Sequence, residues 1–435
     1  MAMEKTVIGL GLLGLGTVGT GVVQVLRDNA REIDRKVGAP IAIKKALVHN
    51  AAKERPGLED LELVTDIDAI VNDPEIDIVV ELMGGIAPAK EYMLRAMAAG
   101  KSVVTANKDV VAQHGLEMFG AAVKNGVDFL FEASVGGGIP IITTFKQCLT
   151  ANRFTEVMGI VNGTTNYMLT KMTNESMDYD VALKEAQAEG YAEADPTADV
   201  GGLDAARKAA ILASLAFNTH ITLEDVQVEG ITNVSAVDIE YARKLDYVVK
   251  LLAIARRVEG RGIDVRVHPT FLTKDHPLAS VNGVFNAIFV RGNAIGDAMF
   301  YGRGAGGRPT ASAVIADVVE AARGILTDSR SRINPEFFEP KQICPIEETE
   351  SRYYLRLRMD DRPGVLGSVA TAFGWAGVSL KSVLQRHVDD GAEVVIVTHT
   401  TKHSSIVAAS QSVAALPGNA RVCSVIRVDK SLENG

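Results

Sequence analysis

The stretch TVIGLGLLGLGTVGTGVVQVL, residues 6–26, decides the fold of the first third of the chain. It contains two overlapping matches to the pattern G-x-G-x-x-G, which begin at Gly9 and at Gly14. The match at Gly9 has only a few strand-like residues before it, whereas the match at Gly14 follows a full apolar strand and opens a helical run over residues 17–33. Only the second match therefore has the context in which a glycine turn approaches a pyrophosphate at a helix N-terminus. The stretch predicts a parallel α/β sheet that binds a dinucleotide.

The same stretch carries no charge and is long enough to suggest a membrane span. Six glycines interrupt it, and no clear basic segment and small-residue cleavage site is present, so we predict neither a membrane span nor a signal peptide.

The net charge of −9 argues against nucleic acid as a partner, because binding that polyanion requires a basic face. Three widely separated cysteines are typical of a protein in the reducing cytoplasm, which is the predicted location.

The second predicted strand, residues 41–48, bears on the choice of cofactor. It ends at His49 and Asn50, with Lys53 and Arg55 close behind. Dinucleotide folds that prefer NAD often place a carboxylate at this position, where it binds the ribose hydroxyls. The missing carboxylate and the nearby positive charge favour NADP, or the use of both NADP and NAD, although basic residues that are merely solvated would give the same pattern.

Two later strands place polar groups at their carboxyl ends, where ligands of such sheets bind. Lys108 follows the strand 102–105 and is predicted to face the cofactor or substrate; a surface lysine is the alternative. The strand 127–132 ends at Glu132 and continues into a loop with three consecutive glycines. Backbone carbonyls of that loop, together with the Glu132 carboxylate, provide the oxygen ligands that hard cations require. A flexible connection between domains would explain the glycines equally well.

The middle of the chain supplies the ionisable groups. Residues 190–208, GYAEADPTADVGGLDAARK, lead into a helix predicted over residues 203–217. Asp204 and Lys208 share a face with the apolar residues one and two turns further on. This pair is either an ordinary ion pair on a helix surface or a site of proton transfer.

Further along, we expect a helix over residues 241–258 and a strand over residues 265–272. A glycine-rich, basic loop at residues 302–310 then opens a helix that continues through Ala322. Because this loop combines glycines, arginines and a helix N-terminus, it is a second candidate contact for the cofactor.

The last hundred residues form a separate region. Residues 331–349 contain three prolines and little periodicity and are predicted to be a linker. The pattern then restarts in the order βαββαβ, with the turn DRPGVL, residues 361–366, after the first strand. This region resembles an ACT domain, and such domains often bind an amino acid at a dimer interface. A domain that only drives oligomerisation is the alternative.

Six segments together resemble the homoserine dehydrogenase family and follow its order: GLGTVGTGV (14–22), TANK (105–108), EASVGGGIP (132–140), NGTTNYML (162–169), GYAEADPTADVGGLDAARKAAIL (190–212) and YGRGAGGRPTASAV (301–314). The resemblance covers residues 5 to about 330, and the long central motif is highly specific. It implies reversible, NAD(P)H-dependent reduction of L-aspartate 4-semialdehyde to L-homoserine, in the biosynthesis of threonine, methionine and isoleucine.

The resemblance also implies roles for individual residues. Lys208 matches the family's acid–base lysine, and Lys108 matches a second active-site lysine. Glu193 and Asp204 match the carboxylates that bind homoserine. Cofactor contacts match at Leu15, Gly16, Thr17, Val18, Gly19, Thr105, Lys108, Gly190 and Gly306. A sodium site matches at Glu132 and at the backbones of Val135, Gly137 and Ile139. The second strand departs from family members that carry an arginine at its end, which leaves the preference for NADP open.

We therefore expect an α/β chain with a Rossmann dinucleotide-binding domain, an α+β substrate-binding and dimerisation domain, and a C-terminal βαββαβ ACT domain. The predicted boundaries are 1–150, completed by a helix at about 305–330, then 151–304, the linker 331–349, and 350–435. We expect a homodimer or homotetramer with threonine as the effector of the ACT domain. Two other interpretations stay open: another NAD(P)-dependent dehydrogenase acting on amino-acid-derived substrates, and a sensor that binds nucleotide and amino acid without turnover.

Overall fold

The structure is a computed structural model that describes residues 6–329, 337–389, 391–416 and 418–429. Two compact units share the chain, and each is assembled from three separate segments. The first unit takes Met1–Val157, Ala210–Glu224 and Asn286–Lys341, and the second takes Met158–Ala209, Asp225–Phe285 and Gln342–Gly435. Neither unit is a continuous stretch of sequence.

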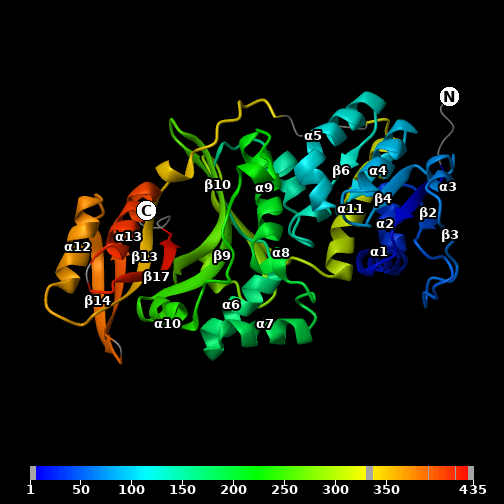
Figure 1. Ribbon diagram of the computed structural model, residues 1–435. Helices are drawn as coiled ribbons and strands as arrows, with labels where there is room; N and C mark the ends of the chain where they lie inside the picture. Colours follow the sequence, from blue (N-terminus) through cyan, green and yellow to red (C-terminus); the bar gives the residue numbers. More distant parts are fainter. Residues whose placement is uncertain (1–5, 330–336, 390, 417, 430–435) are drawn as a thin grey trace. The chain divides into compact units, whose positions relative to one another are not determined.

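The first unit holds a parallel sheet with the strand order β3-β2-β1-β4-β5-β6 (Figure 1). Its strands are β1 (Ile8–Leu13), β2 (Ile41–Leu47), β3 (Leu63–Val64), β4 (Ile78–Glu81), β5 (Ser102–Thr105) and β6 (Phe129–Leu130). Its helices are α1 (Thr17–Asp28), α2 (Ala30–Val37), α3 (Asp68–Val71), α4 (Ala89–Ala98), α5 (Lys108–Asn125) and α11 (Gly307–Leu326), with a 3₁₀ turn at Glu132–Ser134 and a π-helical turn at Thr144–Cys148. Strands β11 (Phe285–Gly292) and β12 (Gly296–Arg303) precede α11.

The order of this sheet determines where a ligand can bind. All six residues of β1 are buried, as expected for a central strand covered on both faces. Helices α1, α2 and α11 share one apolar core with β1, β2 and β4 (Figure 1). The strand order reverses between β1 and β4, and a parallel sheet leaves a crevice beside the carboxyl ends of strands at such a point. Gly14 follows β1 at this edge, and Leu82 follows β4.

The second unit contains a sheet in which β9-β10-β17-β13-β15-β14 lie in this order, with β8 beside β10 and β16 beside β13. These strands are β8 (Gln227–Val228), β9 (Tyr247–Val258), β10 (Gly262–Thr273), β13 (Glu350–Met359), β14 (Leu380–Val388), β15 (Gly391–Thr398), β16 (Thr401–Lys402) and β17 (Arg421–Val428). Its helices are α6 (Gly163–Glu175), α7 (Tyr179–Ala188), α8 (Thr197–Val200), α10 (Ala236–Lys244), α12 (Val365–Trp375) and α13 (His403–Ala414). Strand β7 (Phe154–Ile160) and helix α9 (Leu203–Phe217) each run from one unit into the other.

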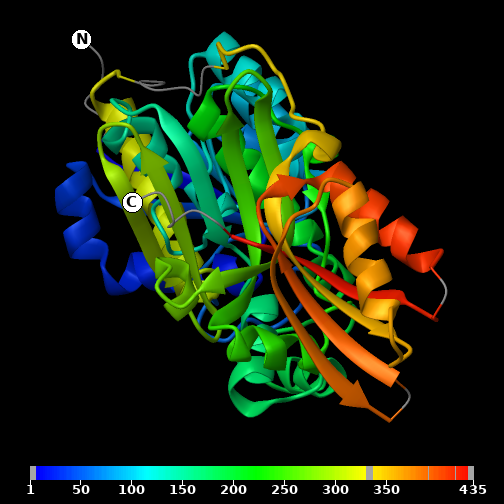
Figure 2. The same cartoon turned by 90° about the vertical axis from the view of Figure 1, so that its left-hand side faces the viewer.

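The C-terminal part of the second unit has the predicted βαββαβ order. Helices α12 and α13 lie side by side on one face of its strands (Figure 2). Their buried residues, among them Val369, Phe373 and Ile406, form one core with Leu355 and Val394 of the strands. The predicted fold class, with a Rossmann sheet, a second mixed region and an ACT domain, is confirmed.

Two local predictions were wrong. The helix expected over residues 241–258 is instead the end of α10 followed by strand β9. Asp246, with φ of +60°, breaks the helix, and β9 then pairs antiparallel with β10 from Tyr247↔Thr273 to Val258↔Gly262. The run 17–33 is divided at Asn29 into α1 and α2.

Two further expectations concern the linker and the question of a membrane span. The first part of the predicted linker, residues 331–336, lies outside the described residues. Among the helices that the structure describes, none combines the length and the apolar character that a membrane crossing requires.

Candidate active site

The three glycines of the turn at residues 14–19 differ in their surroundings as the dinucleotide motif requires. Gly14 has φ of +102°, which favours glycine, and a Cβ there would lie 3.0 Å from the carbonyl oxygen of Leu82. A Cβ on Gly19 would lie 2.3 Å from the carbonyl oxygen of Gly14, so helix and turn are too close for any side chain. A Cβ on Gly16 would meet nothing within 4 Å. The backbone at Gly16 is therefore open to a ligand at the N-terminus of α1.

A second helix begins beside this turn. A Cβ on Gly307, the first residue of α11, would lie 2.9 Å from the carbonyl oxygen of Thr17, and one on Gly21 would lie 2.5 Å from the carbonyl oxygen of Gly307. Gly306, with φ of +122°, precedes that helix. Thr17 is exposed and Val18 partly exposed, on the first turn of α1. Two helix N-termini, each with unpaired N–H groups, thus meet where a pyrophosphate is expected.

The carboxyl ends of β4 and β5 are joined by a network that the sequence did not reveal. Glu81 is fully buried, and its Oε1 accepts hydrogen bonds from the backbone N–H groups of Met83 (2.7 Å) and Gly84 (3.1 Å). Its Oε2 accepts a hydrogen bond from Thr105 Oγ1 at 2.6 Å, and that hydroxyl accepts one from Asn107 N–H. Asn107 caps α5 at Val110. The network therefore fixes the loop from which Lys108, the first residue of α5, begins.

The end of β2 is a solvent-exposed loop. His49, Asn50 and Lys53 are exposed. The guanidinium of Arg55 donates hydrogen bonds to the carbonyl oxygens of Lys53 (2.8 Å) and Asn50 (3.1 Å). Arg55 thus stabilises this loop, and its positively charged guanidinium lies against the loop backbone.

Glu132, which precedes the glycine loop, is buried. Its two carboxylate oxygens accept hydrogen bonds from the backbone N–H groups of Ile142 (2.8 Å) and Thr143 (2.7 Å). Its own N–H donates to Asp317 Oδ2 at 2.7 Å. Burial raises the pKa of the Asp317 carboxyl well above its usual value, and the neighbouring charge of Glu132 adds to that rise.

The other residues of the predicted sodium site follow Glu132 within a few positions of the chain. Val135 and Ile139 are buried, and Gly137 has φ of +55°. The carbonyl oxygen of Ile139 already accepts a hydrogen bond from Ile141 N–H at 2.9 Å. In the part of the chain that the structure describes, no three His, Cys, Asp or Glu side chains gather to hold a metal ion. A cation here would depend on one carboxylate and backbone carbonyls, which are suitable ligands for sodium in chemical type.

In the second unit, α9 brings Asp204 and Lys208 together one turn apart. Lys208 Nζ donates hydrogen bonds to Asp204 Oδ2 and to the carbonyl oxygen of Val161, both at 2.7 Å. The side chains of Lys208 and Asp204 are 12% and 9% exposed, so this is a largely buried pair rather than a solvated ion pair. Asn162, the residue that caps α6, donates from Nδ2 to both Asp204 Oδ2 (2.9 Å) and Asp199 Oδ1 (2.7 Å).

Glu193 and Gly190 lie in the exposed loop between α7 and α8. The carboxylate of Glu193 forms no hydrogen bond or ion pair with a described residue, and its backbone carbonyl accepts one from Gln187 Nε2 at 3.1 Å. Gly190 has φ of +74° and follows α7, where its N–H donates a hydrogen bond to the carbonyl oxygen of Gln187. The loop is held to α6 through the hydrogen bond from Thr164 Oγ1 to the carbonyl oxygen of Tyr191.

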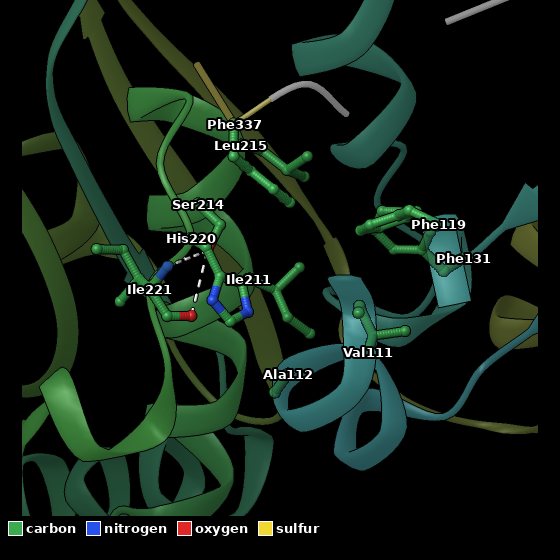
Figure 3. Close-up of a pocket in the computed structure, with 11 residues that line it drawn as sticks. Val111, Ala112, Phe119, Phe131, Ile211, Ser214, Leu215, His220, Ile221 and Phe337 are labelled. Carbon is green, nitrogen blue, oxygen red and sulfur yellow. Dashed lines mark hydrogen bonds between the residues drawn. The ribbon is translucent and has the colours of Figure 1, made fainter. Parts of the chain in front are cut away.

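The apolar stripe of α9 beyond Lys208 lines a pocket in the first unit (Figure 3). Its walls come from α5, α9 and three loop segments: Val111, Ala112, Gly115, Phe119, Phe131, Ile211, Ser214, Leu215, His220, Ile221 and Phe337. The ring of Phe337 lies 6.0 Å from that of Phe119 and 5.9 Å from that of His220. The remaining void of about 20 Å³ has room for one water molecule, so this pocket is a packing site and not a substrate site.

Three functional candidates were missed by sequence reasoning: Glu81, Asn162 and Asp199. Asp199 was visible as one of several acids in the central stretch, and Asn162 as a capping residue before a helix. Nothing local distinguishes Glu81, because its partners come from a different strand.

The comparisons with known proteins agree with the architecture. The family model for homoserine dehydrogenase matches residues 140–319, that for the homoserine dehydrogenase NAD-binding domain matches residues 14–132, and that for the ACT domain matches residues 353–418. The homoserine dehydrogenase of Synechocystis sp. is 49% identical, over 97% of this chain and 99% of the relative. That of Corynebacterium glutamicum is 45% identical, over 97% of this chain and 96% of the relative.

Solved structures give the same result. The homoserine dehydrogenase from Thiobacillus denitrificans superposes with a TM-score of 0.91 at 44% identity, over 98% of this chain and 99% of that one. A hyperthermophilic archaeal homoserine dehydrogenase in complex with NADPH superposes with a TM-score of 0.62 at 27% identity, over 73% of this chain and 98% of that one. The chain therefore belongs to the homoserine dehydrogenase family of NAD(P)-dependent oxidoreductases.

Proposed function

We propose that the chain interconverts L-aspartate 4-semialdehyde and L-homoserine with Lys208 as the group that gives and takes the proton. The observation that carries this proposal is the fixed ammonium of Lys208, held at 2.7 Å by both Asp204 Oδ2 and the carbonyl oxygen of Val161. Those two are its hydrogen-bond partners among the described residues, whereas an ammonium group has three hydrogens. The third hydrogen is available to a substrate oxygen.

The chemistry follows from the charges involved. A bound nicotinamide cofactor supplies the hydride that reaches the aldehyde carbon. Negative charge then develops on the aldehyde oxygen, and Lys208 neutralises it by donating a proton, so that the product is an alcohol. In the reverse direction, neutral Lys208 accepts the hydroxyl proton. The carboxylates of Asp204, Asp199 and Glu193 suit a substrate that carries an α-ammonium group.

Replacement of Lys208 tests the assignment. We expect Lys208→Ala to lower kcat by about 10²–10⁴-fold, the usual contribution of positioned proton transfer, with the Kd of the cofactor nearly unchanged. Lys244→Ala is the matched control, because Lys244 forms an i,i+4 pair with Glu240 on α10 but is half exposed. The measurement is the absorbance of the reduced nicotinamide in the presence of aspartate semialdehyde. A Lys208→Ala enzyme that keeps most of its kcat would refute the role.

For the cofactor, we propose a preference for NADPH over NADH. The support is the absence of a carboxylate at His49 and Asn50, the exposed ammonium of Lys53, and the NADPH bound by the archaeal relative. The ratio of kcat/KM for NADPH to that for NADH should fall in Lys53→Ala, because only NADPH carries the extra phosphate. An unchanged ratio would contradict this preference.

We propose that Glu132 binds a sodium ion together with the backbones of Val135, Gly137 and Ile139. Oxygen ligands and a buried carboxylate support the proposal. The enzyme should then show a higher Tm in sodium chloride than in tetramethylammonium chloride of equal ionic strength. Glu132→Gln should abolish the difference between the two salts, and a difference that persists in this variant would place the effect elsewhere.

We propose that the ACT domain binds threonine in a homodimer or homotetramer and thereby regulates the enzyme. Support comes from its contact with α10 of the same unit, which also holds Lys208: Asp238 of α10 accepts hydrogen bonds from Arg356 Nε (2.7 Å) and Tyr354 O–H (3.0 Å). The single tryptophan, Trp375, is 85% exposed at the end of α12 and is a natural reporter. L-threonine, but not D-threonine, should inhibit turnover and shift the tryptophan fluorescence. Light scattering should give a mass of two or four chains.

A further inference from the structure

The side chain of Asn162 uses its entire hydrogen-bonding capacity, and one of its hydrogen bonds is made to the Asp204–Lys208 pair. Its Oδ1 accepts hydrogen bonds from the N–H and the hydroxyl of Thr165, both at 2.9 Å, and this caps α6. Its Nδ2 donates one hydrogen to Asp199 and the other to Asp204. Asn162 is only 6% exposed, so water does not substitute readily for any of these partners.

The chemistry of this position requires an amide. A carboxylate only accepts hydrogen bonds, so a group placed between Asp199 and Asp204 must donate in two directions. The cap of α6 requires an acceptor on the same side chain. Asparagine meets both needs without a charge of its own, and it lies 2.7 and 2.9 Å from oxygens of the two carboxylates.

The contact reaches the proton donor through one shared atom. Asp204 Oδ2 accepts a hydrogen bond from Asn162 Nδ2 and also from Lys208 Nζ. The residue before Asn162, Val161, supplies the carbonyl that accepts the second hydrogen bond of Lys208. The direction in which the ammonium points is therefore set by two adjacent residues, 161 and 162, and by Asp204.

We propose that Asn162 is a positioning residue for the reaction: its Nδ2 bridges Asp199 and Asp204, which together receive the substrate's ammonium group, and it orients Lys208 through Asp204. This inference rests on the proposed role of Lys208. The hydrogen bonds of this site connect three charged groups, Asp199 on α8 and Asp204 and Lys208 on α9. Because Asn162 also caps a helix, the test must separate positioning from stability.

Two substitutions make that separation. Serine and aspartate both cap helices as well as asparagine does, so Asn162→Ser and Asn162→Asp retain the acceptor for Thr165. Neither retains an amide that donates to both carboxylates. Asn162→Asp further adds a third carboxylate beside Asp199 and Asp204, whose repulsion is relieved when a proton is taken up.

The experiment measures kcat and KM for aspartate semialdehyde across pH, the Kd of the cofactor, and the Tm. Asn162→Ser should lower kcat/KM by about 10- to 100-fold, as expected for lost hydrogen bonds to charged groups, with the cofactor Kd unchanged. Asn162→Asp should be more strongly impaired, and its activity relative to wild type should rise as the pH falls.

Asn166 on the same helix is the matched control. It is 2% exposed, and its Nδ2 donates to three backbone carbonyls, those of residues 281, 283 and 285; in the described part of the chain, neither carboxylate is among its hydrogen-bond partners. Asn166→Ser should lower the Tm without altering the pH profile.

The positioning role is overturned if Asn162→Ser and Asn162→Asp keep the wild-type KM and pH profile. If Asn162→Asp does not fold, Asn162→Ser decides alone. Retained activity in Lys208→Ala would instead overturn the proposed function, so the two failures are distinguishable.

Discussion

At the scale of single residues, two glycines of one turn should respond differently to alanine. Gly16 has φ of −80° and open space around its Cα, so Gly16→Ala should leave the Tm unchanged or slightly raised. Its methyl group would occupy the approach to the cofactor, so the Kd of NADPH should rise by about tenfold or more. The Kd is measured by fluorescence titration, and tight binding by Gly16→Ala would show that the pyrophosphate lies elsewhere.

Gly19→Ala is the companion substitution. Its Cβ would lie 2.3 Å from a backbone oxygen, that of Gly14, which cannot rotate away. Helix α1 must then shift, at a cost of about 1–3 kcal/mol, as for other overpacked positions. Urea unfolding should show lower stability for Gly19→Ala than for Gly16→Ala, and equal stabilities would contradict the close packing of helix and turn.

Lys250 makes a second residue-scale prediction, about pH. This lysine is 3% exposed, and its ammonium donates to Val281 O, Asn166 Oδ1 and Asn282 Oδ1. Burial lowers its pKa from 10.5 to about 8. Between these two values the unfolded chain binds the proton and the folded chain releases it, so this group makes the free energy of unfolding rise with pH. Below pH 8 both states are charged, and the unfavourable effect of burying the charge is fully present.

The test therefore compares how steeply the free energy of unfolding changes with pH in wild type and in Lys250→Met. Each pH unit within the window corresponds to about 1.4 kcal/mol at most. The free energy of unfolding of wild type, relative to that of Lys250→Met, should increase between about pH 8 and pH 10 in urea titrations. Parallel pH profiles for the two proteins would mean that Lys250 has an ordinary pKa in the fold.

At the scale of secondary-structure elements, Thr105 links the ends of β4 and β5. Thr105→Val keeps the shape of the side chain but leaves buried Glu81 Oε2 without its donor and Asn107 N–H without its acceptor. We expect a loss of about 1–3 kcal/mol in the free energy of unfolding. Thr105→Ser, which keeps the hydroxyl, should lose much less. If valine and serine are equally tolerated, the network does not stabilise this edge of the sheet.

The elements also show what sequence can and cannot predict. The turn at Gly14 and the pair Asp204–Lys208 were predictable, because each depends on residues a few positions apart. Strand β9 was not, because its apolar, helix-compatible sequence becomes a strand only through pairing with β10. For the same reason, the contact of Asn162 with Asp199 and Asp204 required the fold, since three separate elements supply the three side chains.

At the scale of the whole molecule, the Rossmann sheet depends on a distant helix. Buried residues of α11, including Val314 and Val318, belong to the same core as Ile8, Leu10 and Val22. A fragment of residues 1–157 should therefore lack a cooperative thermal transition, since one face of its sheet has lost its cover. Addition of a second fragment, residues 286–329, should restore the transition in circular dichroism. A cooperative melt of the first fragment alone would show that α11 is dispensable for folding.

The same arrangement has a consequence for biosynthesis. The ribosome releases the strands of the parallel sheet long before it makes α11, and at about 5–20 residues per second the delay is on the order of ten seconds or more. During that interval the nascent chain exposes the apolar face of the sheet that α11 later covers. Efficient production in cells should therefore depend on a chaperone that shields this surface until translation has passed Leu326.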